Sequence, residues 1–383
     1  MAPTPAWHIL TGEYPPQPGG VSDYTRQVAL ALVRAGQHVH VWAPGDAGTR
    51  EEDGVTVHRV PRLFTPVGLA KLTRGLDACE APRRLLLQYV PHAFGMKAMN
   101  VPFCAWFAAR RRDERWVFFH EVVYPWSPRA PLRHQVLAGT TRVMLRLVAH
   151  AADRVFVSIP GWAEYLPASV RRRAECRPVP STLPSEVTQS AVEAVRSTLG
   201  RGPWLGHFGT YGALTASPLE AVLVPLLRAG AERKALLLGR GSRAFGEALA
   251  ARRPELAGRL VARDSLAPED VVAHLAACDV LVQPYPDGVS ARRTSTMAGL
   301  ALGRPLVTNT GHLTEPMWRE LRAVELVEGT APEPLVAATE RLLSDAGARS
   351  ALGERAARVY RERFALERTV EALLRPGPEG AST

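Results

Sequence analysis

The sequence predicts an α/β protein of two doubly wound domains, each a parallel sheet with helices on both faces, that face each other across a cleft. Three observations support this fold class. Short apolar runs alternate with longer amphipathic stretches along nearly the whole chain, which is the pattern of parallel strands joined by helices. A length of 383 residues suggests two or three domains, and 46% hydrophobic with 22% charged residues is an ordinary globular composition. A polar segment at 181–202 separates two halves of comparable size.

The first half opens with an apolar strand, a loop rich in glycine and proline, and an amphipathic helix. We expect them at 7–10, 12–20 and 21–35, with Gly36 ending the helix because its left-handed C-cap favours glycine. A helix is expected at 131–151. The remaining apolar runs predict strands at 38–43, 55–60, 85–90, 116–122 and 155–159.

The second half repeats the alternation. Strands are expected at 204–208, 235–238, 260–262, 280–284, 306–308 and 325–327, and helices at 218–228, 242–252 and 268–277. These patterns predict a first domain at 1–180, a linker at 181–202 and a second domain at 203–364. We expect the tail at 376–383 to be disordered.

Positive charge is concentrated in the first half of the chain. The whole sequence has 47 Lys and Arg against 37 Asp and Glu, a net charge of +10. Residues 1–180 carry about nine of these excess charges, and the second half is nearly neutral. A basic half favours an acidic partner such as an anionic lipid, a nucleic acid or a phosphorylated substrate, and drift among surface arginines is the alternative explanation. Nucleic acid is disfavoured, because basic residues are not interleaved with aromatic ones.

Several sequence features indicate a cytoplasmic protein. The four cysteines are scattered, with no pair or cluster at zinc-ligand spacing, and are expected to be core thiols. The N-terminus lacks the basic start and apolar stretch of a secretory signal. The most apolar long segment, 85–109, contains Pro91 and Pro102, so a buried strand followed by a buried helix explains it better than a membrane span.

Two candidate sites of the first half lie where strands are expected to end. Ligands of open parallel sheets bind beyond the carboxyl ends of the strands, where helix N-termini offer free N–H groups. Gly19 and Gly20 precede the first helix and would let a ligand approach the backbone closely, or would simply form a tight turn. His120 follows a buried strand and could donate a hydrogen bond to a sugar hydroxyl or act as a base near neutral pH, unless it is structural.

A glycine-rich turn in the second half allows a different interpretation. Gly239 and Gly241 belong to a G-x-G-x-x-A match that follows a strand, with Asp264 at the end of the next strand. This spacing imitates the dinucleotide fingerprint, so nicotinamide binding is an alternative. The fingerprint usually opens its domain, whereas this match follows the second strand of the half.

A fourth candidate is the loop at 284–295, between a buried strand and a helix. Two arginines, two hydroxyls and the free amides of a helix start would form a diphosphate clamp, and a solvated arginine pair is the alternative. The residues concerned are Gly288, Ser290, Arg292, Arg293, Thr294 and Ser295. No Walker loop, nucleophile elbow, H-E-x-x-H or Asp-x-Asp motif is present, so we expect no metal site of the last kind and no cofactor beyond a nucleotide substrate.

Taken in order, the glycine pair at 19–20, the His120-Glu121 dipeptide, the turn at 238–241 and the segment 279–305 give the chain a specific resemblance. It resembles the GT-B glycosyltransferases of family 4, also called glycosyl transferases group 1, over nearly its whole length. The resemblance implies two Rossmann-like domains, of which the first binds the acceptor and the second a nucleotide diphosphate-sugar. It also implies a final helix at 365–375 that crosses back to the first domain.

The resemblance implies a role for each candidate residue. Gly19 and Gly20 would lie against the donor phosphates or sugar, and His120 would contact the transferred sugar. Arg292 and Arg293 would hold the diphosphate and stabilise its leaving charge. The other implied donor-binding residues are Gly209, Gly239, Gly241, Gly288, Ser290, Thr294 and Ser295. Such enzymes usually retain the anomeric configuration without a metal, and a sugar, lipid-linked or polysaccharide acceptor on an anionic membrane surface would suit the basic first domain.

The sequence also departs from this family. Its usual pair of glutamates would fall at Ser290 and Ala298, and its Arg and Lys after the first strand of the second domain are absent from 206–214. We therefore expect Arg292 and Arg293 to replace the lost cations. A protein that keeps the fold but acts as a binding or partner subunit is the second interpretation, and a nicotinamide-dependent enzyme is the third.

Overall fold

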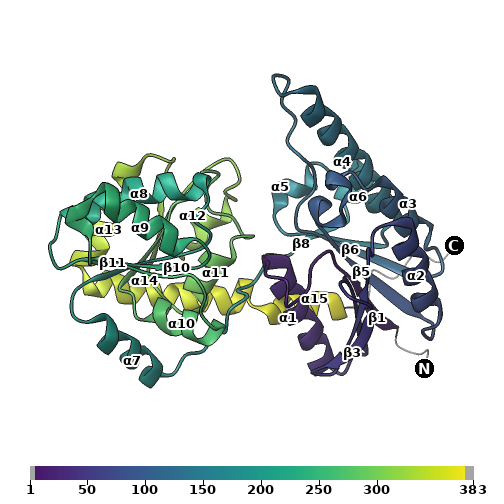
Figure 1. Ribbon diagram of the computed structural model, residues 1–383, viewed down its shortest axis with the longest axis horizontal. Coiled ribbons are helices and arrows are strands. Elements are labelled where there is room, and N and C mark those ends of the chain that lie inside the picture. Colours follow the sequence, from purple (N-terminus) through teal and green to yellow (C-terminus); the bar gives the residue numbers. More distant parts are fainter. Residues whose placement is uncertain (1–4, 376–383) are drawn as a thin grey trace. The chain divides into compact units, whose positions relative to one another are not determined.

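The computed structural model describes residues 5–375, and within them the chain divides into two compact units (Figure 1). Unit 1 contains the chain up to Pro178 and returns from Leu366 onward, and unit 2 contains Val179–Ala365. The last helix, α15 (Leu366–Leu374), therefore belongs to unit 1, where it contacts α1 (Gly20–Arg34). The tail expected to be disordered lies outside the described residues.

Unit 1 is built on an eight-stranded sheet with the order β3-β4-β2-β1-β5-β6-β7-β8. Every pair is parallel except β3 with β4. The strands are β1 (Ala6–Leu10), β2 (Val39–Pro44), β3 (Gly48–Glu52), β4 (Val55–Val60), β5 (Arg83–Tyr89), β6 (Glu114–Phe119), β7 (Arg154–Val157) and β8 (Ala174–Cys176). Because side chains alternate between the two faces of a strand, the buried apolar runs fill a core on each face.

Helices cover both faces of this sheet. One face packs under α2 (Pro66–Asp77), α3 (Val101–Ala109) and α4 (Leu132–Ala151), which share a core cluster with the strands. Helices α1 and α15, which contact each other, lie on the other face (Figure 1). The apolar segment at 85–109 divides into β5 and α3, as expected. Short helical turns complete the unit: η1 (Pro91–Phe94), η2 (Met96–Ala98), α5 (Pro160–Ala163) and α6 (Ala168–Arg171). None of the described helices is long and apolar enough to cross a membrane.

Unit 2 contains a six-stranded, all-parallel sheet with the order β11-β10-β9-β12-β13-β14. The strands are β9 (Trp204–Phe208), β10 (Lys234–Leu238), β11 (Leu260–Arg263), β12 (Val280–Gln283), β13 (Leu306–Asn309) and β14 (Glu325–Val327). Helices α8 (Ala213–Arg228), α9 (Ser242–Arg252) and α13 (Pro332–Ser344) share one core cluster with this sheet. The other helical elements are α7 (Gln189–Leu199), η3 (Pro254–Leu256), α10 (Pro268–Ala276), α11 (Thr294–Ala301), α12 (Met317–Leu321), α14 (Ala346–Val359) and η4 (Tyr360–Phe364).

The structure differs from the sequence expectations in a few elements. The range 181–202, expected as a linker, contains α7, which contacts α10 and belongs to unit 2. Helix α8 starts at Ala213, five residues before Pro218. The helix was expected to start at Pro218, because proline is common in the first turn of a helix. Strand β6 ends at Phe119 rather than at residue 122.

The antiparallel edge strand β3 was not expected from the sequence, because it is charged and exposed. Asp53 and Gly54 connect β3 to β4, and their φ angles of 52° and 82° are those of a type I′ hairpin turn. The Asp-Gly pair was therefore the signal for this hairpin.

Three histidines stack across neighbouring strands of unit 1. The rings of His8 and His40 lie 4.7 Å apart, those of His40 and His58 5.3 Å apart, and the Trp42 indole donates a hydrogen bond of 3.2 Å to His8 Nδ1. Burial lowers the pKa of His8 to about 3 and that of His58 to about 4. Burial also lowers the pKa of His40, so all three rings are neutral near pH 7.

We expect the free energy of unfolding to fall as the pH drops from 7 to 5. An unfolded His8 takes up a proton near its usual pKa of 6.5, whereas the folded one stays neutral until about pH 3. His8 alone should therefore cost about 2 kcal/mol of stability over this range. His8→Asn keeps an acceptor for Trp42 and removes the titration, so urea unfolding at the two pH values should show a smaller loss. An equal loss in this variant would contradict the interpretation, and His312→Asn in an exposed loop is the control.

Candidate functional site

Glycine-rich turns follow β9 and β10 at the carboxyl edge of the unit 2 sheet. Gly239 has a φ of +105°, and a Cβ there would lie 2.2 Å from the carbonyl oxygen of Gly209. Gly241, with a φ of +87°, caps the N-terminus of α9. The structure thus brings these three predicted residues together, and two of them are glycine because of their backbone conformation.

Asp264 caps helix α9 rather than pointing toward a ligand. Its Oδ1 atom accepts hydrogen bonds of 2.8 Å from the Ser242 hydroxyl and from the Arg243 N–H. These two bonds hold the pKa of Asp264 below its usual value, and the bond from the Arg243 N–H has the larger effect. In the dinucleotide interpretation this carboxylate should bind a ribose, so its use as a helix cap argues against nicotinamide binding.

The two predicted arginines share one acidic partner at the start of α11. Arg292 Nη2 lies 2.9 Å from Asp287 Oδ2, and Arg293 pairs with the other oxygen of the same carboxylate. The Arg293 guanidinium also lies over the Tyr285 ring, 4.5 Å from its centroid. Two cations held by one anion leave an excess positive charge in this loop. The sequence interpretation did not assign Asp287, although its position in the same loop was the available signal.

The other predicted residues of this loop have mainly structural surroundings. Gly288 has a φ of +81°, and a Cβ there would lie 2.1 Å from the backbone nitrogen of Gly311. The Ser295 hydroxyl lies 2.7 Å from the Tyr285 hydroxyl. Ser290 is buried, and its hydroxyl has no partner within residues 5–375. Thr294, the first residue of α11, is half-buried.

A buried carboxylate that the sequence interpretation missed supports this loop. Glu315 accepts hydrogen bonds from the Ala291 N–H (2.9 Å) and the Trp318 indole (2.8 Å), and burial raises its pKa. Its partner Ala291 follows Ser290, which is one of the two positions where the family has a glutamate and this chain does not. The other such position, Ala298, is buried in α11. No local motif indicated Glu315, because it lies in a different loop, 24 residues after Ala291.

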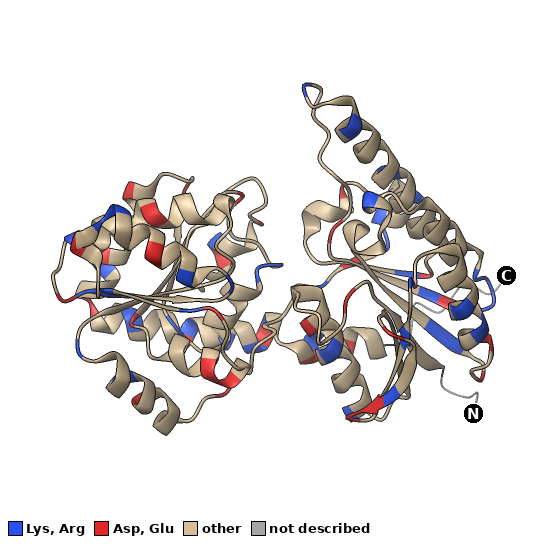
Figure 2. Cartoon of the chain, in the orientation of Figure 1, with Lys and Arg blue, Asp and Glu red and all other residues tan. Residues whose placement is uncertain are grey.

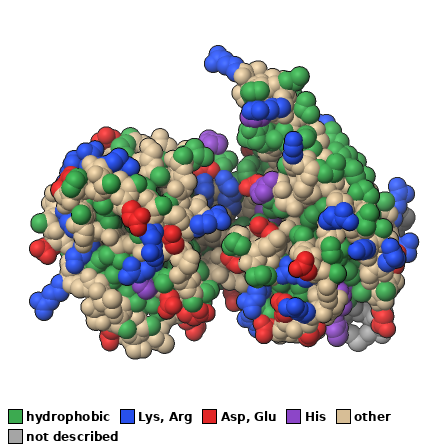
Figure 3. Space-filling model, viewed as in Figure 1, with side chains coloured by type: hydrophobic (Ala, Val, Ile, Leu, Met, Phe, Trp, Pro, Cys, Tyr) green, Lys and Arg blue, Asp and Glu red, His purple; other side chains and the backbone are tan. Residues whose placement is uncertain are grey.

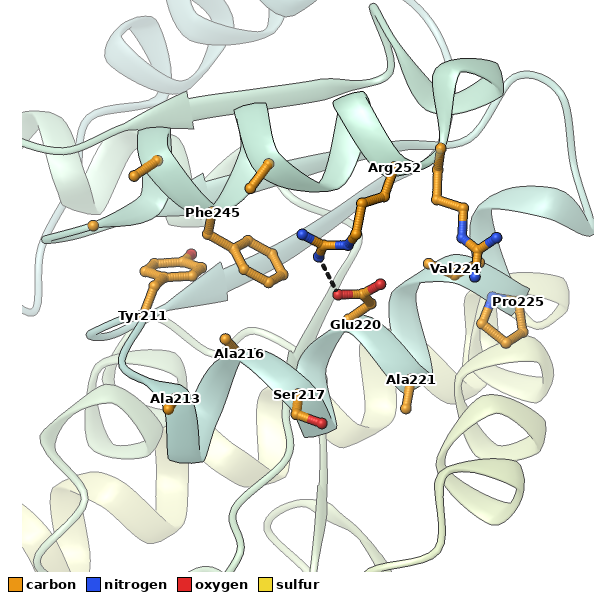
Figure 4. A pocket seen from close by; sticks show the side chains of 14 residues that line it. Tyr211, Ala213, Ala216, Ser217, Glu220, Ala221, Val224, Pro225, Phe245 and Arg252 are labelled. Atoms are coloured by element: carbon orange, nitrogen blue, oxygen red, sulfur yellow. Dashed lines mark hydrogen bonds and ion pairs between the residues drawn. The ribbon is translucent and has the colours of Figure 1, made fainter.

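A groove of about 830 Å³ runs between α8 and α9 (Figure 4). Tyr211 and Phe245 lie close together at one end, with ring centroids 5.3 Å apart, and Arg252 pairs with Glu220 farther along (Figure 4). Its lining is mainly small and apolar, and of the predicted residues only Gly241 contributes to it. The groove therefore does not coincide with the arginine loop.

In unit 1 the glycine pair begins helix α1. Gly19 is the N-cap and has no capping side chain, and Gly20 is the first helical residue. A Cβ on Gly19 would lie 2.6 Å from Glu13 Oε2, so this carboxylate packs against the glycine, whereas a Cβ on Gly20 would meet open space. Burial, followed by the Glu13 charge, raises the pKa of Asp23 in the same first turn.

His120 follows β6 directly, at the carboxyl edge of the unit 1 sheet. It is only 6% exposed, and burial lowers its pKa to about 3. Its Nε2 atom lies 2.7 Å from Oε1 of Gln88, a residue that the sequence interpretation did not single out. A base with so low a pKa is weak near neutral pH, so the structure favours a hydrogen-bonding role over the role of a base.

Comparisons with known proteins identify the kind of domain and the fold. Residues 19–182 match the model of a glycosyl transferase 4-like domain. A search of curated proteins gave no match. The structure is similar to sucrose-phosphate synthase from Thermosynechococcus elongatus, with a TM-score of 0.73 and 18% sequence identity over 97% of both chains. It is also similar to HepE from Anabaena in complex with UDP and glucose, with a TM-score of 0.68 and 16% identity over 97% of this chain and 98% of that one. A third similar structure is the UDP-forming trehalose-phosphate synthase from Burkholderia xenovorans in complex with glucose-6-phosphate, with a TM-score of 0.70 and 11% identity over 97% of this chain and 99% of that one. These findings confirm the resemblance to family 4-like glycosyltransferases and the GT-B fold class.

We expect Gly239→Ala to lower the free energy of unfolding by more than about 2 kcal/mol, because the added Cβ overlaps the Gly209 carbonyl and the positive φ is strained. Gly246→Ala in α9 is the matched control: its Cβ would meet Leu237 and Ala262 at 3.5 and 3.6 Å, which is ordinary contact. It should be neutral or stabilise by up to about 1 kcal/mol. Urea unfolding measures both, and equal stability of the two variants would contradict the expectation.

Proposed function

We propose that this chain, with a glycosyl transferase 4-like domain at 19–182 and the GT-B fold over its length, is a glycosyltransferase that uses a nucleotide diphosphate-sugar. The observation that carries the proposal is the pair Arg292 and Arg293 at the start of α11, held together by Asp287 at the carboxyl edge of a parallel sheet. A diphosphate is the ligand that best suits two adjacent guanidiniums beside a helix N-terminus.

In this proposal unit 2 binds the donor. Arg292 and Arg293 contact the diphosphate and stabilise the negative charge that develops as the bond between the sugar C1 and the diphosphate oxygen breaks. Asp287 keeps the two side chains converging, and Glu315 holds the loop from behind through Ala291. Among the similar structures, those of HepE contain UDP, so UDP is the first diphosphate to test.

Unit 1 is proposed to bind the acceptor, and His120 to contact the transferred sugar. The acceptor oxygen forms the new bond to C1, and its proton passes to the departing phosphate oxygen on the same face, as the family resemblance implies. Retention of configuration and independence from metal are parts of this proposal. They are tested by NMR of the anomeric proton of the product and by assays with and without EDTA.

A binding or partner protein without transferase activity is the second candidate. The observation that favours it is the absence of a carboxylate at Ser290 and Ala298, which are both buried. Such a protein would bind a nucleoside diphosphate, or nothing at all, and would neither hydrolyse nor transfer the sugar.

We expect Arg292→Ala and Arg293→Ala each to weaken the binding of UDP, or of another nucleoside diphosphate that binds, by about tenfold or more. Calorimetry with a panel of nucleoside diphosphates and NAD measures this, followed by donor hydrolysis and transfer assays. Arg341→Ala is the control, because Arg341 is an exposed arginine of unit 2 that pairs with Glu325. Unchanged affinity and turnover in both variants would refute the clamp, and NAD binding alone would favour the dehydrogenase.

An exposed face of α4 supports the further proposal of an anionic membrane partner. Leu132 is 76% exposed, Val136 51% and Val143 46%, at helical spacings that place them together. Arg133 and Arg146 are exposed on the same helix. Figure 2 marks basic residues along α4, whose first part projects from the rest of unit 1 (Figure 1), and Figure 3 shows hydrophobic and basic side chains side by side on this projection. Apolar side chains flanked by arginines suit an anionic lipid surface.

We expect the protein to sediment with vesicles that contain phosphatidylglycerol, more strongly at low than at physiological salt. The double variant Leu132→Ser with Val136→Ser should bind these vesicles about tenfold more weakly, because two apolar side chains that would be buried among the lipids are removed. Val67→Ser, which removes a similarly exposed apolar side chain from α2, is the control. Absence of binding at both salt concentrations would end the membrane proposal.

A further inference from the structure

We infer that Gln88 is a positioning residue that fixes the proton of His120 on Nε2, so that His120 presents Nδ1 to substrate as a hydrogen-bond acceptor. The inference rests on the proposed function, because it assumes that His120 contacts the transferred sugar. It assigns a role to a residue that the family resemblance did not indicate.

The geometry around the ring allows this assignment. Gln88 Oε1 lies 2.7 Å from His120 Nε2, and a carboxamide oxygen only accepts hydrogen bonds, so the ring nitrogen carries the proton. Because burial keeps the ring neutral, the other nitrogen, Nδ1, then has a free lone pair. Nδ1 has no hydrogen-bond partner in the described part of the chain, and a sugar hydroxyl could donate to it.

The strand register puts Gln88 in reach of His120. Strands β5 and β6 pair in parallel with Gln88 opposite Phe118, so the two side chains project from the same face, and His120 follows two residues later on that face. The backbone of His120 is fixed by its N–H to the Tyr89 carbonyl (3.2 Å) and by its own carbonyl, which accepts from the Trp162 indole (2.9 Å). The position of the ring is therefore set before substrate binds.

The other neighbours of the ring do not select its protonation. The Phe118 ring stacks on it at 4.6 Å, and the Tyr24 ring of α1 meets it edge-on at 4.8 Å. Ser158 and Trp162 donate hydrogen bonds to its carbonyl oxygen. The charged neighbour Glu121 raises the pKa of His120, but burial outweighs it. Tyr24 is titratable, yet burial raises its pKa far above the neutral range.

The test changes the partner of Nε2 in the full-length chain. Gln88→Glu places a carboxylate beside the ring, which favours the doubly protonated form and should raise the pKa of His120 by about two pH units or more. The extra proton on Nδ1 removes the acceptor, so transfer should fall at low pH and recover as the pH rises. Gln88→Met keeps the length of the side chain without an acceptor and should leave a mixture of the two neutral tautomers.

Long-range proton–nitrogen NMR of 15N-histidine-labelled protein reports the tautomer and pKa directly, with the His120 signal assigned by His120→Asn. We expect the neutral Nε2–H tautomer from pH 5 to 8 in the unaltered chain, and both predicted changes in the Gln88 variants. Gln189→Glu, an exposed site in unit 2, is the control for added charge. An Nδ1–H tautomer in the unaltered chain would overturn the inference, as would a pKa in Gln88→Glu within about half a unit of the original value.

The NMR result separates this inference from the proposed function. If no donor supports transfer but the Nε2–H tautomer is found and responds to the Gln88 variants, the proposed function fails and the assignment of the proton stands. If transfer occurs and its pH profile is identical in Gln88→Glu and the unaltered chain, the positioning role fails while the proposed function stands.

Discussion

Parallel pairing of neighbouring strands is the constraint on which the rest of this structure depends. In each unit it brings the carboxyl ends of several strands to one edge, so that residues far apart in sequence become neighbours. In unit 2 this edge collects the turn around Gly209, the turn at Gly239 and the arginine loop that follows β12. In unit 1 it collects the start of α1 and His120. Every candidate residue lies at such an edge, where the helix N-termini that follow the strands offer free backbone N–H groups.

Charge at these edges is compensated by few and specific partners. Asp287 holds both Arg292 and Arg293, which keeps two like charges adjacent in the absence of a ligand and leaves one positive charge in excess. The buried carboxylate of Glu315 supports the backbone behind them. The family positions for glutamate are occupied by Ser290 and Ala298, and the carboxylates that contact the arginine loop are instead Asp287 and Glu315. The positive charge of the first half lies elsewhere, in part on the exposed face of α4.

Burial determines the chemistry of the histidines more than their position in the sequence does. His8 and His120 are both neutral near pH 7 because the surrounding apolar side chains exclude water. At His8 this affects stability, because the unfolded chain can take up a proton that the folded one cannot. At His120 it leaves a neutral ring with one donor and one acceptor nitrogen, and the hydrogen bond to Gln88 decides which is which.

The sequence by itself determined the alternation of strands and helices, the two halves, the glycine turns and the arginine loop, because these depend on local periodicity and on the backbone freedom of glycine. It missed β3, whose signal was the Asp53-Gly54 pair, and it expected a linker where α7 packs. Only the tertiary structure decided the partners of the functional side chains. Gln88 and His120 are 32 residues apart, which is too far for a local sequence motif to connect them. A slip of one residue between β5 and β6 would place Gln88 on the opposite face from His120. Glu315 reaches Ala291 from another loop in the same way, because contacts across strands depend on register and not on neighbouring residues.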